Sequence, residues 1–170
     1  LLAQRLDQEN QARRVLEQQM TQEAIALIEA QHMHQNAKIL VVGKPHWHPG
    51  VVGIVASRLA DRFGRPAIVI GEGGKGSGRS IPSFHLHEAL VACASHLQGF
   101  GGHAHAAGVQ LNMETLDGFA EAMNRFADTQ LSQEDLGKVM FYDQVLGLDQ
   151  ISFGMIADLS RAAPYGRGNP

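Results

Sequence analysis

The stretch VVGIVASRLADRFGRPAIVIG, residues 51–71, sets the fold class of this 170-residue chain. A helix is predicted to begin near Gly50 and to run through Phe63, with Gly64 closing it, because glycine is common just after a helix end. The run RPAIVIG, residues 65–71, is short, β-branched and bounded by glycine, which is typical of a buried strand. A helix followed directly by a buried strand favours a layered α/β fold.

Further elements continue the alternation of helix and strand. The run AKILVVG, residues 37–43, predicts another buried strand, and AAGVQLN, residues 106–112, predicts a third. Helices are predicted over residues 85–97 and 113–131. The glycine-rich stretch 72–81 fits either a loop or a strand whose backbone lies close to another group. We therefore predict an α/β fold in which helices flank a mixed β-sheet.

The chain divides by sequence character into three parts. Residues 1–36 contain strong helix formers and no glycine or proline, which predicts a long connector helix. Its apolar stripe is incomplete, so its first half has little to bury here. Residues 37–131 form the predicted α/β domain, and residues 132–170 form a C-terminal extension. That extension has a strand candidate at 138–146, a helix candidate at 151–163 and a turn-rich ending, so we expect a fragment with further domains on both sides.

Composition predicts a soluble globular protein that binds any anionic ligand through its middle third. Hydrophobic residues make up 44% and charged residues 18% of the chain, and the net charge is −3. Between residues 38 and 108, seven Lys or Arg against three Asp or Glu give +4, which leaves −7 for the rest. No run approaches the roughly 20 apolar residues of a membrane helix and no secretory signal opens the chain, so we expect a cytoplasmic protein with no membrane partner. The single Cys93 cannot form an internal disulfide.

The stretch FGGHAHAAG, residues 100–108, places small residues on both sides of one histidine. A glycine turn is the simpler interpretation, but a turn needs only one or two such residues. The segment therefore predicts a backbone that a large group approaches closely beside His103. The small residues are Gly101, Gly102, Ala106, Ala107 and Gly108.

Four motifs together carry a family resemblance. They are HWHPGVVGIVASRLADRFGRPAIVI at 46–70, GSGRS at 76–80, GGHAHAAG at 101–108 and PYGRGNP at 164–170. The chain resembles the second half of the catalytic core of the RecJ family of single-strand-specific exonucleases, in the DHH phosphoesterase superfamily. The GGHxxAAG pattern marks DHH-associated domains generally, and the HWH and GSGRS blocks narrow the resemblance to RecJ. It implies a DHH domain before the connector helix and an OB-fold after the chain.

The resemblance also implies a role in a larger enzyme. The parent reaction would be 5′-to-3′ hydrolysis of single-stranded DNA in repair and recombination, with Mn²⁺ or Mg²⁺. In the family, aspartates and a DHH triplet of the preceding domain hold these metals, and this sequence contains no DHH triplet. Two-metal cleavage needs carboxylates that hold both ions, so we expect no metal site, no cofactor and no activity in the isolated chain. Its predicted task is to clamp single-stranded DNA opposite the missing DHH domain.

Particular residues of these motifs are expected to contact the DNA. His103 is expected to donate to a phosphate as charge develops, beside a nest of amides from the two preceding glycines; a histidine satisfied within the core is the alternative. Gly78 is expected to admit the DNA backbone, Arg79 to bind a phosphate and Ser80 to add a hydroxyl donor, whereas the alternative is a flexible hairpin with a solvated arginine. Arg58 is expected to contact a phosphate or a neighbouring domain.

The segment HWHPG, residues 46–50, precedes the predicted helix at 51–63. The amides of Val51 and the next residue are expected to be unpaired at the positive end of this helix and to receive a phosphate. His46 and His48 flank that position. Trp47 either stacks on a base or packs in the core.

Three other interpretations compete with this one. The first is a transition-metal site built from His-x-His pairs, namely His46 with His48, His85 with His87, and His103 with His105. The middle pair opens a predicted helix, which separates its rings, and His105 falls at an open position of GGHxxAAG. The second is a DHH-family phosphodiesterase acting on short RNA or cyclic dinucleotides. The third is a non-catalytic nucleic-acid-binding module, such as an RNA-recognition domain of a synthetase.

Overall fold

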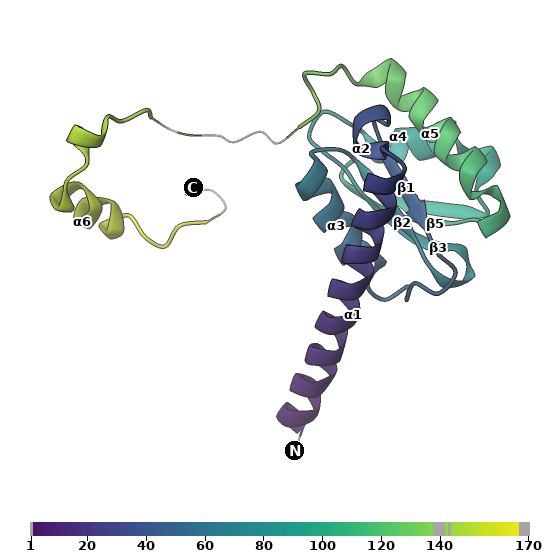
Figure 1. The fold of residues 1–170 in the computed structure, drawn as a ribbon, viewed down its shortest axis with the longest axis horizontal. Helices are drawn as coiled ribbons and strands as arrows, with labels where there is room; N and C mark the ends of the chain where they lie inside the picture. Colours follow the sequence, from purple (N-terminus) through teal and green to yellow (C-terminus); the bar gives the residue numbers. More distant parts are fainter. Residues whose placement is uncertain (1, 138–141, 143, 167–170) are drawn as a thin grey trace. The chain divides into compact units, whose positions relative to one another are not determined.

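The computed structural model describes residues 2–137, 142 and 144–166, in two compact units that divide between residues 138 and 139 (Figure 1). The helices of the first unit are α1 (Leu2–Ala30), α2 (Met33–Asn36), α3 (Val52–Phe63), α4 (Leu86–Ala92) and α5 (Leu116–Gln130). Its strands are β1 (Leu40–Gly43), β2 (Ala67–Ile70), β3 (Lys75–Arg79), β4 (Gly99–Gly102) and β5 (Ala106–Gln110). The second unit contains α6 (Phe153–Arg161).

The strands of the first unit form one mixed sheet in the order β1-β2-β3-β5-β4. Strands β1 and β2 are parallel and are joined through α3, while the other pairs are antiparallel. Helix α3 ends at Gly64, whose backbone has φ +59°, the left-handed conformation that glycine adopts without strain. The predicted α/β fold with a mixed sheet and flanking helices is confirmed.

Helices pack on both faces of the sheet, and the side chains of each strand point to these two faces in alternation. In β2, Ala67 and Val69 belong to a hydrophobic cluster with α1 and α3, whereas Ile68 and Ile70 belong to a second cluster with α4 and α5. All four side chains are buried, as expected of a strand with helices on both faces. We call the side of α1 and α3 the α3 face, and the other side the α4 face.

Helix α1 packs on the sheet through its C-terminal half only. Met20, Ala24 and Ile28 are buried, whereas residues 2–15 are exposed and extend away from the sheet in Figure 1. This is the outcome that the incomplete apolar stripe predicts. The helix ends at Ala30, and α2 follows. The domain boundaries after residues 36 and 131 stay predictions.

Two glycine-rich segments form strands that the sequence did not clearly predict. The stretch 72–81 contains β3, which is one of its two predicted interpretations. Strand β4 was not predicted, because three of its four residues are glycine, and glycine is depleted in strands. It forms because the turn at 103–105 returns the chain directly alongside β5.

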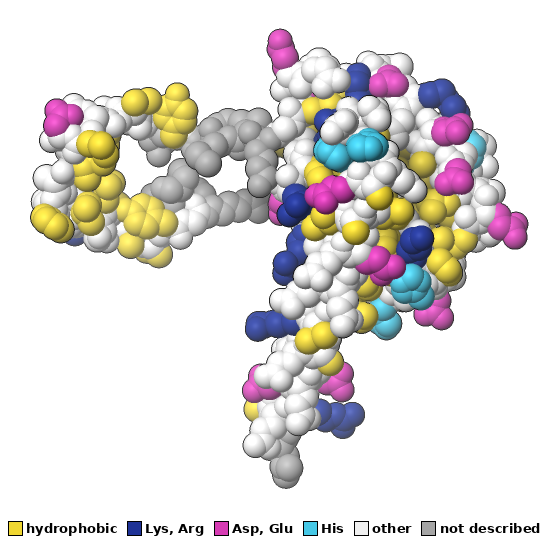
Figure 2. Space-filling model, in the orientation of Figure 1, with side chains coloured by type: hydrophobic (Ala, Val, Ile, Leu, Met, Phe, Trp, Pro, Cys, Tyr) yellow, Lys and Arg dark blue, Asp and Glu magenta, His cyan; other side chains and the backbone are white. Residues whose placement is uncertain are grey.

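In the second unit, α6 begins after Ser152, whose hydroxyl accepts a hydrogen bond from the Met155 amide at 3.2 Å. This confirms the helix predicted within 151–163. The strand candidate at 138–146 lies largely outside the described residues. Figure 2 shows hydrophobic side chains on the surface of this unit. No helix among the described residues is long and apolar enough to cross a membrane.

Candidate functional site

Several residues without a side chain lie together on the α3 face, on strands β4 and β5. The strand register places Ser77 opposite Gly108 and Gly108 opposite Gly101. Two residues further along β3, Arg79 pairs with Ala106. Residues paired in this way share a face. We call this area, together with Gly99 on β4, the glycine surface; it consists of Ser77, Arg79, Gly99, Gly101, Ala106 and Gly108.

The fold itself does not require glycine at three of these positions. A Cβ atom built on Gly99 or Gly101 would meet no heavy atom within 4 Å, and one on Gly108 would meet only two carbonyl oxygens at 4.0 Å. Side chains therefore fit there, and none of the three backbones lies in the left-handed region that favours glycine. Packing among the residues that the structure describes therefore does not explain why glycine occupies these three positions.

Other small residues of the motifs have packing or conformational roles. Gly78 faces the other way, because its Cβ would lie 2.7 Å from Leu86 Cδ2 in the core. Ala107 is buried in the same cluster. Gly102 has φ +146° and lies against the Ala106 carbonyl. The expectation that Gly78 and Ala107 make room for DNA is therefore wrong: they make room for α4 and the core of the α4 face.

Arg79 lies on the glycine surface beside the first turn of α3. Its Nη1 atom donates to the Gly78 carbonyl at 2.8 Å and to Ser77 Oγ at 3.0 Å. Its Nη2 atom lies 3.2 Å from the position of a Cβ on Gly53 of α3. The arginine is therefore partly ordered by its own strand, and is not the freely solvated side chain of a flexible hairpin.

His103 follows β4 directly and is exposed. Its amide donates to the Ala106 carbonyl at 2.8 Å, and Ala106 is the strand partner of Arg79, so His103 and Arg79 belong to the same end of the sheet. The imidazole forms no hydrogen bond or ion pair with the residues that the structure describes. The alternative of a histidine satisfied within the core is thereby excluded.

Ser80 and His105 hold the adjoining loops together. The Ser80 hydroxyl donates to the Phe84 carbonyl at 2.7 Å, and the Ser80 amide donates to the His105 carbonyl at 3.0 Å. The expectation that Ser80 offers a free hydroxyl donor is therefore wrong. The polar residue that shares the glycine surface with Arg79 is Ser77, which the sequence analysis did not single out.

The HWHPG segment contacts the connector helix. Trp47 is completely buried and its Nε1 donates to Glu23 Oε2 at 2.8 Å, while His46 Nε2 lies 3.0 Å from Glu23 Oε1. The hydrogen bond from Trp47 is the main reason that the pKa of Glu23 lies below its ordinary value, with His46 contributing in the same direction. Burial leaves Trp47 no surface on which a base could stack.

The helix start near Gly50 is less open to an anion than expected. The Val51 amide donates to the His48 carbonyl at 3.2 Å, and the Val51 side chain is buried. His48 Nδ1 in turn accepts a hydrogen bond from the Gly50 amide at 3.0 Å. The prediction of an unpaired Val51 amide is wrong, because the turn before α3 already uses it.

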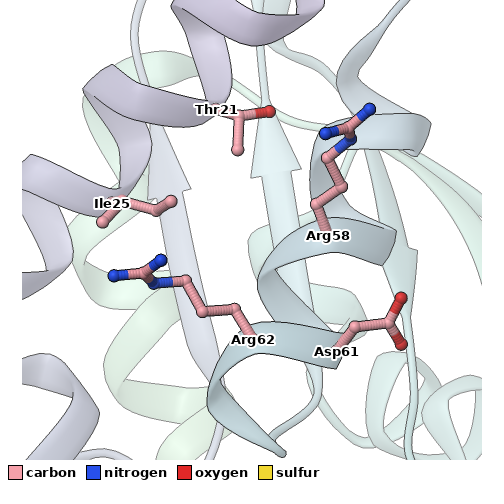
Figure 3. Close-up of a pocket in the computed structure, with 5 residues that line it drawn as sticks. All are labelled: Thr21, Ile25, Arg58, Asp61 and Arg62. Atoms are coloured by element: carbon pink, nitrogen blue, oxygen red, sulfur yellow. The ribbon is translucent and has the colours of Figure 1, made fainter.

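Arg58 is bound to the connector helix and does not reach the glycine surface. Its Nε atom lies 2.5 Å from Oε1 of Glu17, a carboxylate that is only 3% exposed. Figure 3 shows the hollow of about 440 Å³ beside this pair, in which Arg58 and Arg62 point in different directions. The residues lining it are Thr21, Ile25, Arg58, Asp61 and Arg62. Arg58 therefore contacts α1 of the same unit, and its expected contact with a phosphate or a neighbouring domain stays a prediction.

Residues 36–129 match the DHHA1 domain family. The match covers more than half of the chain and includes all five strands of the sheet, and with them the glycine surface. The chain belongs to the DHHA1 domain family.

Proteins similar to this chain carry the name single-stranded-DNA-specific exonuclease RecJ. The Bacillus subtilis protein is 45% identical over 174 residues, covering 99% of this chain and 22% of that protein. The Escherichia coli protein is 34% identical over 180 residues, covering 100% of this chain and 31% of that protein. The crystal structure of Thermus thermophilus RecJ in complex with Mn²⁺ superposes with a TM-score of 0.85 at 29% identity, over 99% of this chain and 25% of that chain. The DHHA1 chain thus spans under a third of the length of these relatives.

The histidine pairs of this DHHA1 domain lie in separate environments. His85 caps α4 by accepting a hydrogen bond from the Glu88 amide at 3.2 Å, and the His87 ring lies 5.9 Å from that of Phe100. His46 pairs with Glu23. Among the described residues, no group of three or more His, Cys, Asp or Glu is placed to hold a metal ion. The residues present therefore do not fit the manganese or magnesium of the solved relatives.

Proposed function

We propose that this chain is the part of a RecJ-type exonuclease that holds single-stranded DNA, and that the glycine surface is where the sugar-phosphate backbone lies. The observation that carries the proposal is the set of three glycines, Gly99, Gly101 and Gly108, whose side-chain positions are open although the fold has room for side chains. Strand glycines with open side-chain positions let a nucleic-acid backbone come close to the strands.

Polar groups at the edge of the glycine surface supply the phosphate contacts. Arg79 offers N–H donors beyond the two contacts that Nη1 makes, and guanidinium binds phosphate through paired donors. The Ser77 hydroxyl on the same face donates to the Ala107 carbonyl and accepts from Nη1, so it orders the arginine. His103 supplies a further donor at the same end of the sheet, where it would meet phosphate charge as the transition state forms.

The cleavage step belongs to a part of the enzyme outside this chain. Hydrolysis of single-stranded DNA from the 5′ end would use Mn²⁺ or Mg²⁺ bound by a DHH domain, in keeping with the metals named for the solved relatives. An OB-fold would extend the DNA-binding surface. We place the parent enzyme in the cytoplasm, in DNA repair and recombination.

Gly108→Val tests the proposal in the full-length protein that contains this chain. Valine favours a strand and meets open space here, so the thermal midpoint should be unchanged or higher. The isopropyl group should keep the DNA backbone away and raise the Kd for a single-stranded oligonucleotide about tenfold or more, a loss of about 1.4 kcal/mol. Binding is measured by fluorescence anisotropy in EDTA, which prevents cleavage.

Phe100→Val is the matched control, because Phe100 lies on the neighbouring strand β4 and faces the opposite side of the sheet, where its ring contacts His87. It should leave the Kd unchanged. Wild-type affinity in Gly108→Val would contradict the proposal. Equal binding of a short RNA, or stronger binding of a dinucleotide than of the longer DNA, would favour a phosphodiesterase for those substrates instead.

A further inference from the structure

Gly53 is the second residue of α3 and stands directly over the polar residues of β3. Glycine stabilises a helix less than alanine does, so its presence in α3 needs a local reason. A Cβ atom built on Gly53 would lie 3.2 Å from Arg79 Nη2, 3.2 Å from Ser77 Oγ and 3.6 Å from Ser77 Cβ. The three nearest atoms therefore belong to the two polar side chains of the glycine surface.

The space left by Gly53 fixes where the Arg79 guanidinium lies. Nη1 is held by the Gly78 carbonyl and Ser77 Oγ, so the plane of the group is set from the β3 side. Nη2 then projects toward the first turn of α3, and a contact of 3.2 Å is tighter than most contacts of a real Cβ atom. A methyl group at position 53 would have to move the guanidinium, because the tip of a long side chain yields more easily than a helix.

Gly118 shows what an ordinary helical glycine looks like in this fold. It lies in the first turn of α5, and its Cβ would meet only the His96 ring, with both nearest atoms at 3.6 Å. That distance is normal van der Waals contact. Gly118→Ala therefore makes the same chemical change near a helix start, without touching Arg79 or Ser77.

We propose that Gly53 is a positioning residue for phosphate binding: its missing side chain leaves room for Ser77 and for the Arg79 guanidinium, so that Arg79 presents its remaining N–H donors on the glycine surface in one fixed arrangement. This inference rests on the proposed role of Arg79 in binding DNA. Gly53 itself touches no phosphate and acts through the arginine. The specificity of the site thus depends on a helix that flanks the sheet, in addition to the strands themselves.

The test is a double-mutant cycle in the full-length protein. Gly53→Ala, Arg79→Ala, the double variant and Gly118→Ala are compared for binding of a 5′-phosphorylated single-stranded oligonucleotide in EDTA at several salt concentrations. Arg79→Ala should make the negative slope of log K against log salt less steep by about 0.7, the value for one phosphate of a single strand. Gly53→Ala should raise Kd about fivefold and should also make the slope less steep. The double variant should match Arg79→Ala, and Gly118→Ala should match the wild type.

Each outcome separates this inference from the proposed function. Wild-type binding by Arg79→Ala would refute the role of the arginine in phosphate binding and, with it, the positioning role of Gly53, whereas the glycine surface is tested separately by Gly108→Val. Weakened binding by Arg79→Ala with wild-type binding by Gly53→Ala would overturn only the positioning role. Additive losses in the double variant would also overturn it, since Gly53 would then act independently of Arg79.

Thermal unfolding keeps the inference testable if Gly53→Ala folds poorly. Removing Arg79 in the double variant removes one of the two side-chain atoms that lie 3.2 Å from the new methyl, the other being Ser77 Oγ. Recovery of the thermal midpoint in the double variant would support the contact between position 53 and Arg79. A midpoint as low as that of Gly53→Ala alone would place the clash elsewhere and overturn the inference.

Discussion

Ser77 and Arg79 lie two residues apart on β3 and point to the same face of the sheet, where Ser77 Oγ accepts a hydrogen bond from Arg79 Nη1 at 3.0 Å. The hydroxyl itself lies 3.4 Å from the Ala107 carbonyl of the neighbouring strand. The serine therefore links the arginine to β5. An arginine held in this way loses less side-chain entropy when it binds a phosphate than a free one would.

Ser77→Ala should weaken DNA binding through this link. Nη1 of Arg79 loses one hydrogen-bond acceptor, which should weaken the free energy of DNA binding by about 1 kcal/mol. The Kd for single-stranded DNA should therefore rise about fivefold, with little change in the stability of the fold. Ser80→Ala is the control from the same motif. Its hydroxyl holds the Phe84 carbonyl, so that variant should lose about 1 kcal/mol of unfolding free energy and keep its affinity. The reverse pattern would restore the predicted DNA contact of Ser80.

His103→Ala should affect catalysis more than binding in the full-length enzyme. If the imidazole meets phosphate charge mainly in the transition state, kcat should fall on the order of a hundredfold while Kd in EDTA changes little. His105→Ala, two residues along the same exposed loop, should leave both values near wild type. Equal losses of affinity in His103→Ala and Arg79→Ala, with kcat unchanged, would show that the loop only clamps the DNA.

Glu23→Gln should make stability less dependent on acid pH. The pKa of Glu23 is lowered in the folded protein by Trp47 and His46. The charged form of Glu23 therefore stabilises the fold at pH values above the ordinary carboxyl pKa of about 4.5. This contribution is lost as the pH falls through the lower pKa of the folded protein. At pH 7, urea unfolding should give the variant a free energy of unfolding that is smaller than that of the wild type by less than about 1 kcal/mol. That deficit should disappear in strong acid. Glu9→Gln, on the exposed half of the same helix, should show no deficit at either pH.

Arg58→Ala should destabilise the fold without weakening DNA binding. It leaves the buried Glu17 carboxylate without its cation, which should cost about 2 kcal/mol, less than a fully buried pair would, because Arg58 is half-exposed. Arg62→Ala should lower the free energy of unfolding by less than about 1 kcal/mol, because the Arg62–Glu29 pair is exposed. Chemical denaturation measures both. A rise in Kd for Arg58→Ala as large as that for Arg79→Ala would return Arg58 to the DNA-binding surface.

Sequence patterns predicted the helices and strands correctly where interactions between nearby residues determine the structure. The β-branched run before Gly71 and the helix closed by Gly64 could be read directly, because periodicity and capping act within a few residues. Strand β4 could not, since its glycines have low strand propensity and only the register with β5 makes them a strand. Trp47 was equally ambiguous, because its burial depends on Glu23, distant in sequence and close in space.

The candidate site could be predicted only in part, for the same reason. Motif composition singled out Arg79 and His103 but could not say which glycines face a ligand and which face the core. Alternation along KGSGR would have paired Ser77 with Arg79 and turned Gly78 away from them, once that segment was known to be a strand. Gly53 carried no sequence signal, because its role depends on a contact between α3 and β3.

The most direct test of the DNA-binding surface is a crystal structure of the full-length protein with a 5′-phosphorylated single-stranded oligonucleotide, grown in EDTA. We predict a phosphate oxygen within hydrogen-bond distance of the Arg79 guanidinium and a sugar-phosphate backbone in van der Waals contact with Gly101 and Gly108. Oligonucleotide bound elsewhere on this domain, such as in the hollow between α1 and α3, with the glycine surface uncovered, would contradict the account.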